Sequence, residues 1–148
     1  MADRTQSSIV VDATPAAVLG VVGDFGAYPE WTGAVRGVEV LDPGRAGRAR
    51  RVRYVLDAGA IRDTYVLDYD WDVAADGTGI LSWTLVEAGV LKAMDGSYEL
   101  RAAAGGGCAV TYTLAVDLRI PMLGMLRRKA EKVITETALN ELKKRVEG

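Results

Sequence analysis

The sequence predicts an α+β fold in which a curved, antiparallel, seven-stranded sheet wraps around one long C-terminal helix. Short β-branched and aromatic runs with period-two alternation recur between glycine-rich turns from about residue 35 to residue 117. In the last segment, residues 121–146, apolar residues recur instead at three- and four-residue spacing. The 148 residues, of which 49% are hydrophobic and 26% charged, suit one folded domain spanning 1–148.

The first elements are a strand at residues 8–11 and two short helices. Thr14 is a suitable N-cap and Pro15 suits the first helical position, so a helix is expected to run to Val22. Residues 24–31 form a second helical turn that carries aromatic side chains. With six further strands and the final helix, the expected order is β-α-α-β6-α.

The six further strands have one apolar and one solvated face because their side chains alternate. Their expected limits are 35–41, 48–57, 61–72, 79–87, 92–103 and 108–118. In the strand at 61–72 the odd positions form the buried face: Ile61, Asp63, Tyr65, Leu67, Tyr69 and Trp71. The final helix, opened by Pro121, is expected to cover this face with one stripe: Leu126, Ala130, Val133, Ile134, Thr137, Ala138 and Leu142.

Two absences limit the chemistry. The chain has no histidine, which excludes Ser-His-Asp and Cys-His catalysis and histidine metal sites. Its one cysteine, Cys108, excludes an internal disulfide and a cysteine-cluster metal site, so we expect neither a metal nor another cofactor.

The charge and hydropathy patterns limit the partners and the location. With 18 basic and 20 acidic residues, the chain has no general attraction to nucleic acid. No segment approaches the roughly 18 consecutive apolar residues of a membrane span, and the first residues are polar, unlike a signal peptide. We therefore expect a cytoplasmic protein, present as a monomer or weak homodimer.

Four segments carry a resemblance to a known family. They are residues 11–15 (Val-Asp-Ala-Thr-Pro), 24–31 with the ending Tyr-Pro-Glu-Trp, 96–100 (Gly-Ser-Tyr-Glu-Leu) and 106–112. In this order they resemble the START-like (SRPBCC) superfamily, whose helix-grip fold is shared with the major birch pollen allergen. Within it the chain is similar to the actinobacterial polyketide cyclase/dehydrase and lipid transport group, although Cys108 replaces that group's usual threonine. The resemblance implies a hydrophobic cavity between sheet and long helix for a lipid, a polyketide or another apolar molecule.

A physical argument also favours a cavity, because one helix cannot fill the trough of a long, bent sheet. Aromatic residues with polar tips suit a wall that is mainly apolar and offers a few hydrogen bonds, although they also suit a filled core. The expected lining residues are Trp31, Tyr54, Asp63, Tyr65, Tyr69, Trp71, Trp83, Tyr98, Tyr112, Leu126, Ala130, Val133 and Ile134.

Asp63 and the basic run from Arg45 to Arg53 each have more than one interpretation. Asp63 falls on the buried face, where it pairs with Arg50, binds a ligand hydroxyl, or lies at the strand's start within reach of water. The basic run either contacts phosphate or an anionic head group, or is a solvated strand that faces the acidic residues at 68–72.

The apolar segment at residues 120–126 precedes three basic residues, 127–129. It is either a lip at the cavity entrance, where transient membrane contact without stable insertion is possible, or an ordinary helix start that packs inward.

Three functions compete. The first, which we take as the prediction, is non-catalytic binding or transport of a small hydrophobic ligand, since the chain offers no nucleophile–base pair. The second is a polyketide aromatase/cyclase in which Tyr54, Asp63, Tyr65 and Arg50 handle the proton. The third is a protein-interaction module with a vestigial cavity.

Overall fold

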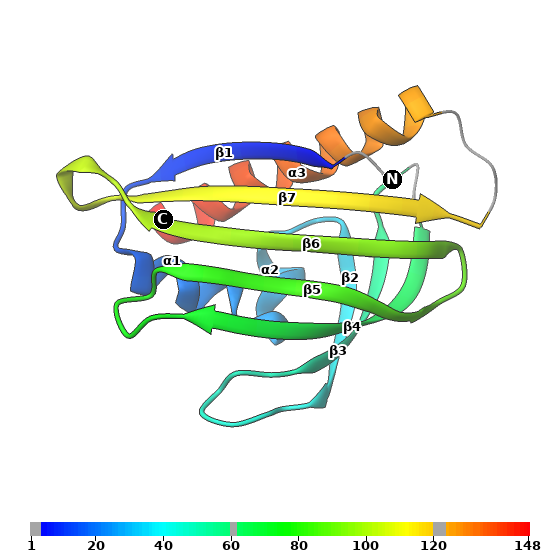
Figure 1. Ribbon diagram of the computed structural model, residues 1–148, viewed down its shortest axis with the longest axis horizontal. Helices are drawn as coiled ribbons and strands as arrows, with labels where there is room; N and C mark the ends of the chain where they lie inside the picture. Colours follow the sequence, from blue (N-terminus) through cyan, green and yellow to red (C-terminus); the bar gives the residue numbers. More distant parts are fainter. Residues whose placement is uncertain (1–3, 60–61, 120–123) are drawn as a thin grey trace.

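The computed structural model of the protein describes residues 4–59, 62–119 and 124–148 (Figure 1). Its elements are, in chain order, β1 (Thr5–Val11), α1 (Pro15–Val22), the 3₁₀ turn η1 (Phe25–Ala27), α2 (Tyr28–Trp31), β2 (Val35–Asp42), β3 (Arg51–Asp57), β4 (Arg62–Val73), β5 (Gly79–Ala88), β6 (Leu91–Ala102), the 3₁₀ turn η2 (Ala104–Gly106), β7 (Cys108–Leu118) and α3 (Gly124–Glu147). The predicted order of strands and helices is confirmed. Ile61 and residues 120–123, to which the expected strand start and lip were assigned, lie outside the described residues.

The seven strands form one antiparallel sheet in the order β1-β7-β6-β5-β4-β3-β2. The first strand therefore pairs with the last, and β1 and β2 are the two edge strands of the sheet. Helix α3 packs against β1 and β7, and Figure 1 shows it along that side of the sheet. Within the described residues no helix has the length and apolar character needed to cross a membrane.

The alternation that predicted the strands also determines the core. In β3 the side chains of Val52, Tyr54 and Leu56 are buried, while those between them are exposed. The strict alternation expected in β4 is wrong at one point, because Val66 is buried as well as its neighbours Tyr65 and Leu67. The register against β5 shifts at the same point, since Val66 pairs with Glu87 and Leu67 with Leu85, which leaves Val86 as the extra residue of a bulge in β5.

Helix α1 begins as predicted. The Thr14 hydroxyl accepts a hydrogen bond from the Ala17 N–H at 3.2 Å, and Pro15 occupies the first turn, where its missing N–H is not needed. The helix ends at Val22, with Gly23 as its C-cap.

The face of α3 that meets the sheet differs from the predicted stripe. Leu126 and Val133 are each 53% exposed, whereas Glu131 and Thr135 are fully buried. The Glu131 carboxylate accepts hydrogen bonds from the Val116 N–H at 2.7 Å and from the Thr5 hydroxyl at 2.9 Å. Hydrogen bonds from β1 and β7 thus allow polar residues to occupy positions that apolar spacing alone assigns to hydrophobic side chains.

The connection between β2 and β3 is longer than expected, because β3 begins at Arg51 rather than near residue 48. Gly44 adopts a φ of +61°, and a side chain there would lie 2.1 Å from the Arg48 carbonyl oxygen. The chain rejoins the sheet through the Arg50 N–H, which donates to the Asp42 carbonyl at 2.9 Å. The loop therefore places Arg45, Arg48 and Arg50 at the edge of the sheet instead of in a regular strand.

Candidate functional site

A small interior cavity of about 70 Å³ lies between the inner face of the sheet and the helices. We call it the interior cavity, and its lining consists of Tyr28, Trp31, Thr32, Val35, Tyr54, Leu56, Tyr65, Leu67, Tyr69, Trp83, Met94, Tyr98, Tyr112 and Ala138. Its volume is well below the roughly 300–1,000 Å³ of typical small-molecule sites. Large aromatic side chains thus fill most of the trough that α3 leaves uncovered.

The aromatic rings of the lining form one continuous cluster. The Trp83 ring centre lies 5.8 Å from that of Tyr69, 5.6 Å from that of Tyr98 and 5.7 Å from that of Tyr112. Trp83 reaches this position because residue 96 on the neighbouring strand is glycine: a Cβ at Gly96 would lie 2.4 Å from the indole ring. The missing side chain at residue 96 therefore makes room for the Trp83 indole against β6.

Several polar atoms of the lining have no partner. The buried indole nitrogens of Trp31 and Trp83 form no hydrogen bond. Within the described part of the chain the hydroxyls of Tyr65, Tyr98 and Tyr112 are likewise unpaired. Since buried polar groups normally find a partner, these two indole N–H groups are unsatisfied hydrogen-bond donors of the lining residues.

Two other tyrosines in the lining are satisfied within the protein. The Tyr28 hydroxyl donates to the Val22 carbonyl oxygen, and the hydroxyls of Tyr54 and Tyr69 share a hydrogen bond of 2.6 Å. Tyr69 is further held by Phe25, whose ring stacks on it with centres 4.1 Å apart. These contacts fix the end of the interior cavity nearest η1 and α2.

The site is uncharged. Among the described residues that line the interior cavity there is no Asp, Glu, Lys or Arg. Burial raises the pKa of every tyrosine in the lining above its ordinary value, so all of these hydroxyls stay protonated near neutral pH. The lining can donate and accept hydrogen bonds, but it holds no group with the pKa of a general base.

The structure places the expected site residues in several different regions. Apart from Trp71, the aromatic residues expected in the lining do line the interior cavity: Trp31, Tyr54, Tyr65, Tyr69, Trp83, Tyr98 and Tyr112. Ala130 and Ile134 pack against the core without lining the cavity, and Leu126 and Val133 lie on the exposed side of α3. Trp71 and Arg50 lie outside it, in a cleft beside the β2–β3 loop.

Of the three interpretations of Asp63, the pair with Arg50 is wrong. The Asp63 carboxylate accepts hydrogen bonds from the Gly89, Val90 and Leu91 amides at 2.8–3.0 Å, and from the Thr64 amide at 2.8 Å. Asp63 is thus occupied in holding the turn between β5 and β6. Arg50 precedes β3, whereas Asp63 pairs with Leu56 near the end of that strand, so the strand separates the two side chains.

Sequence reasoning missed part of the lining. Tyr28, Thr32 and Met94 line the interior cavity and were not among the expected site residues. Tyr28 belongs to the Tyr-Pro-Glu-Trp segment, so the aromatic spacing of that segment was the available signal. Thr32 and Met94 gave no such signal, because a single threonine or methionine is common in any core.

The similarity of this chain to known proteins agrees with the fold described above. The family model for polyketide cyclase/dehydrase and lipid transport proteins matches residues 2–147. The chain belongs to this family. No curated protein matches this chain in sequence.

Several solved structures have the same fold as this chain. A START superfamily protein from Mycobacterium smegmatis superposes with a TM-score of 0.87, at 18% identity over 97% of each chain. The ZhuI aromatase/cyclase from a Streptomyces species gives a TM-score of 0.80, at 17% identity over 99% of this chain and 94% of that one. A Thermus thermophilus protein gives 0.78, at 24% identity over 97% of each chain. At these identities the likeness establishes the START-like, helix-grip fold.

Proposed function

We propose that the protein binds a small, mainly apolar molecule carrying a hydrogen-bond acceptor, and that it holds this ligand in the interior cavity without converting it. The observation that carries the proposal is the pair of buried, unpartnered indole N–H groups of Trp31 and Trp83 in a lining without charged side chains. A ligand carbonyl or ether oxygen would satisfy these donors, and its carbon skeleton would replace contacts among the aromatic rings.

The proposal includes an expansion of the interior cavity, because about 70 Å³ is too small for a ring-containing ligand. Two lining residues favour such an expansion. Met94 has a flexible, unbranched side chain, and Trp31 is only partly buried, in the four-residue helix α2. Displacement of either side chain would enlarge the site without disturbing the hydrogen bonds of the sheet.

A matched pair of probes tests the proposal. 2-Acetylnaphthalene carries a carbonyl that 2-ethylnaphthalene lacks, and the two molecules are otherwise alike in size. We expect both to bind and the ketone to bind about fivefold to tenfold more tightly, which is the effect of one hydrogen bond to an otherwise unpaired donor. Calorimetric or fluorescence titration measures the two Kd values.

Two tryptophan variants localise the effect. In Trp83→Phe the preference for the ketone should fall, because one of the two unpartnered indole donors is removed. Trp71→Phe is the control, since the Trp71 indole N–H already donates to the Ala49 carbonyl at 2.8 Å outside the interior cavity. Failure of both probes to bind the unmodified protein would overturn the proposal.

A second candidate is an aromatase/cyclase, favoured by the fold shared with the ZhuI aromatase/cyclase. The unpaired hydroxyls of Tyr65, Tyr98 and Tyr112 could donate a proton to a folded polyketide chain. The uncharged lining favours binding over this chemistry. Conversion of a linear poly-β-ketone analogue into an aromatic product, lost in Tyr65→Phe, would instead support the cyclase.

A further inference from the structure

A cleft of about 500 Å³ opens on the surface beside the β2–β3 loop. We call it the arginine cleft, and it is lined by Asp42, Gly44, Arg45, Arg48, Arg50, Tyr69, Asp70 and Trp71. Three arginines face two aspartates, so the lining carries a net positive charge. Within the described chain none of the three guanidinium groups forms an ion pair or a side-chain hydrogen bond.

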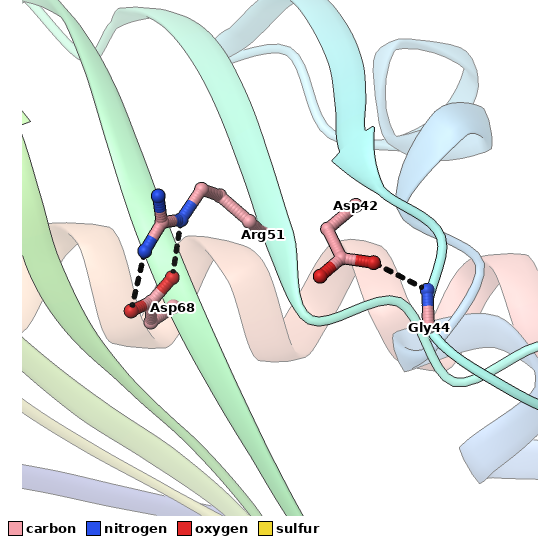
Figure 2. A network of polar contacts seen from close by, with 4 residues as sticks. All are labelled: Asp42, Gly44, Arg51 and Asp68. Carbon is pink, nitrogen blue, oxygen red and sulfur yellow. Dashed lines mark hydrogen bonds and ion pairs between the residues drawn. The ribbon is translucent and has the colours of Figure 1, made fainter.

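The neighbouring carboxylates are turned to other partners. Figure 2 shows the Asp42 carboxylate accepting a hydrogen bond from the Gly44 N–H, at 2.9 Å. The same view shows Asp68 held by Arg51 through two contacts of 2.7 and 3.2 Å. Asp70 is the remaining acidic group in the lining, and it is exposed. The arginine cleft thus carries a net positive charge, and none of its three guanidinium groups is held in an ion pair within the described chain.

One wall of the arginine cleft is rigid and aromatic. The Trp71 indole is fixed by its hydrogen bond to the Ala49 carbonyl, and the Arg48 guanidinium lies 5.8 Å from the indole centre. A guanidinium held over an aromatic ring keeps its planar edge available for an oxyanion. Arg48 and Trp71 also line a second hollow, of about 430 Å³, beside α1, so there is open space on both sides of Arg48.

Tyr69 connects the arginine cleft to the interior of the protein. It lines both the arginine cleft and the interior cavity. A molecule with its apolar part in the interior cavity and a charged group in the arginine cleft would therefore have to pass this one residue. Tyr69 is held by Tyr54 and Phe25, so a molecule that spans both hollows requires these side chains to move.

We propose that the arginine cleft binds the oxyanion of the same ligand whose apolar part occupies the interior cavity, so that the ligand is an amphipathic organic anion such as a carboxylate or a phosphate monoester. This inference rests on the proposed function, since it assigns a charged end to that ligand. It also gives a role to the basic run of the sequence, of which Arg51 and Arg53 are used in ion pairs with Asp68 and Glu39.

The test uses two fluorescent probes of similar shape. 1-Anilinonaphthalene-8-sulfonate is an amphipathic anion, and N-phenyl-1-naphthylamine is its neutral counterpart. The variant replaces Arg45, Arg48 and Arg50 with glutamine. A control with the same change in net charge replaces Arg36, Arg101 and Arg119, which are exposed and lie outside the arginine cleft.

We expect the Kd of the sulfonate to rise about tenfold in the cleft variant and less than about twofold in the control, since each exposed charge contributes modestly. The Kd of the neutral probe should change in neither. ¹H–¹⁵N spectra should show the sulfonate shifting the Trp71 indole signal and the amides of residues 44–50.

The outcomes separate the two proposals. If the neutral probe binds and the cleft variant weakens the sulfonate no more than the control does, the arginine cleft is not an anion site and the proposed function stands. If the sulfonate binds through the three arginines and the neutral probe does not bind, the arginine cleft binds an anion, but the proposed function fails and with it the assignment of that anion to the same ligand. If neither probe binds, both proposals are wrong.

Discussion

The hydroxyl oxygens of Tyr54 and Tyr69 lie 2.6 Å apart in the protein interior and join β3 to β4 across the end of the interior cavity. The two residues are not directly opposite in the sheet, since Tyr54 pairs with Tyr65 in the register. The contact is therefore a diagonal one that only long side chains can make.

Removing one hydroxyl of this pair should destabilise the protein. Tyr54→Phe leaves the Tyr69 hydroxyl without its partner, and the free energy of unfolding should fall by about 1–3 kcal/mol. Urea unfolding measures the change, and the double variant with Tyr69→Phe should lose less than the sum of the single changes. Tyr65→Phe is the control, because its hydroxyl forms no hydrogen bond within the described residues. Equal losses in Tyr54→Phe and Tyr65→Phe would contradict the prediction.

The six tyrosines should titrate together and only when the protein unfolds. Burial is the main cause that raises the pKa of each one above its unfolded value of about 10. A raised folded pKa gives stability that is fully present below pH 10 and is lost as pH rises above it. At pH 11 the six groups together remove about 8 kcal/mol, which is comparable to the whole stability of a typical domain.

Ultraviolet absorbance and circular dichroism test this prediction in one alkaline titration. We expect tyrosinate to appear in a single steep step, near pH 11, that coincides with the loss of secondary structure. A gradual titration centred near pH 10 with the fold intact would show that the tyrosines are accessible to solvent.

Asp63 should matter for stability rather than for binding. Asp63→Ala removes the acceptor for three amides of the β5–β6 turn, and the free energy of unfolding should fall by about 2–3 kcal/mol. Amide exchange should accelerate at residues 89–91, while the Kd of the neutral probe stays unchanged. Asp72→Ala is the matched control, since Asp72 is exposed on the same strand and forms no ion pair within the described residues. If Asp63→Ala lost probe binding while its stability stayed normal, Asp63 would instead belong to the ligand site.

Glu131 should anchor α3 to the sheet. Glu131→Ala leaves the Val116 N–H without a partner in a fully buried position, and we expect a loss of about 2–4 kcal/mol in urea unfolding. Glu131→Gln should lose less, because the amide can accept from Val116 and donate to Thr5. Glu136→Gln on the exposed side of the helix should change stability by less than about 0.5 kcal/mol. Equal effects at the two positions would argue against the buried contact.

The order of strands and helices along the chain could be predicted, because alternation, turns and the terminal helix are local signals. The sequence was not sufficient for the face of α3, since Glu131 and Thr135 are buried by hydrogen bonds that a hydrophobic pattern does not register. Strand alternation predicted the aromatic residues that β3 to β7 contribute to the lining of the interior cavity. Alternation did not predict the role of Asp63, because the partners of this residue lie 26 to 28 residues along the chain and depend on how two hairpins meet.

The arrangement around Trp83 has an optical consequence. Three tyrosine rings lie within 6 Å of this indole, so excitation absorbed by the tyrosines passes to Trp83 by resonance transfer rather than being emitted by them. A guest that spreads these rings or hydrogen-bonds the indole alters both the transfer and the emission wavelength. Binding of a ligand in the interior cavity would therefore be detectable as a change in the intrinsic fluorescence of Trp83, without an added label.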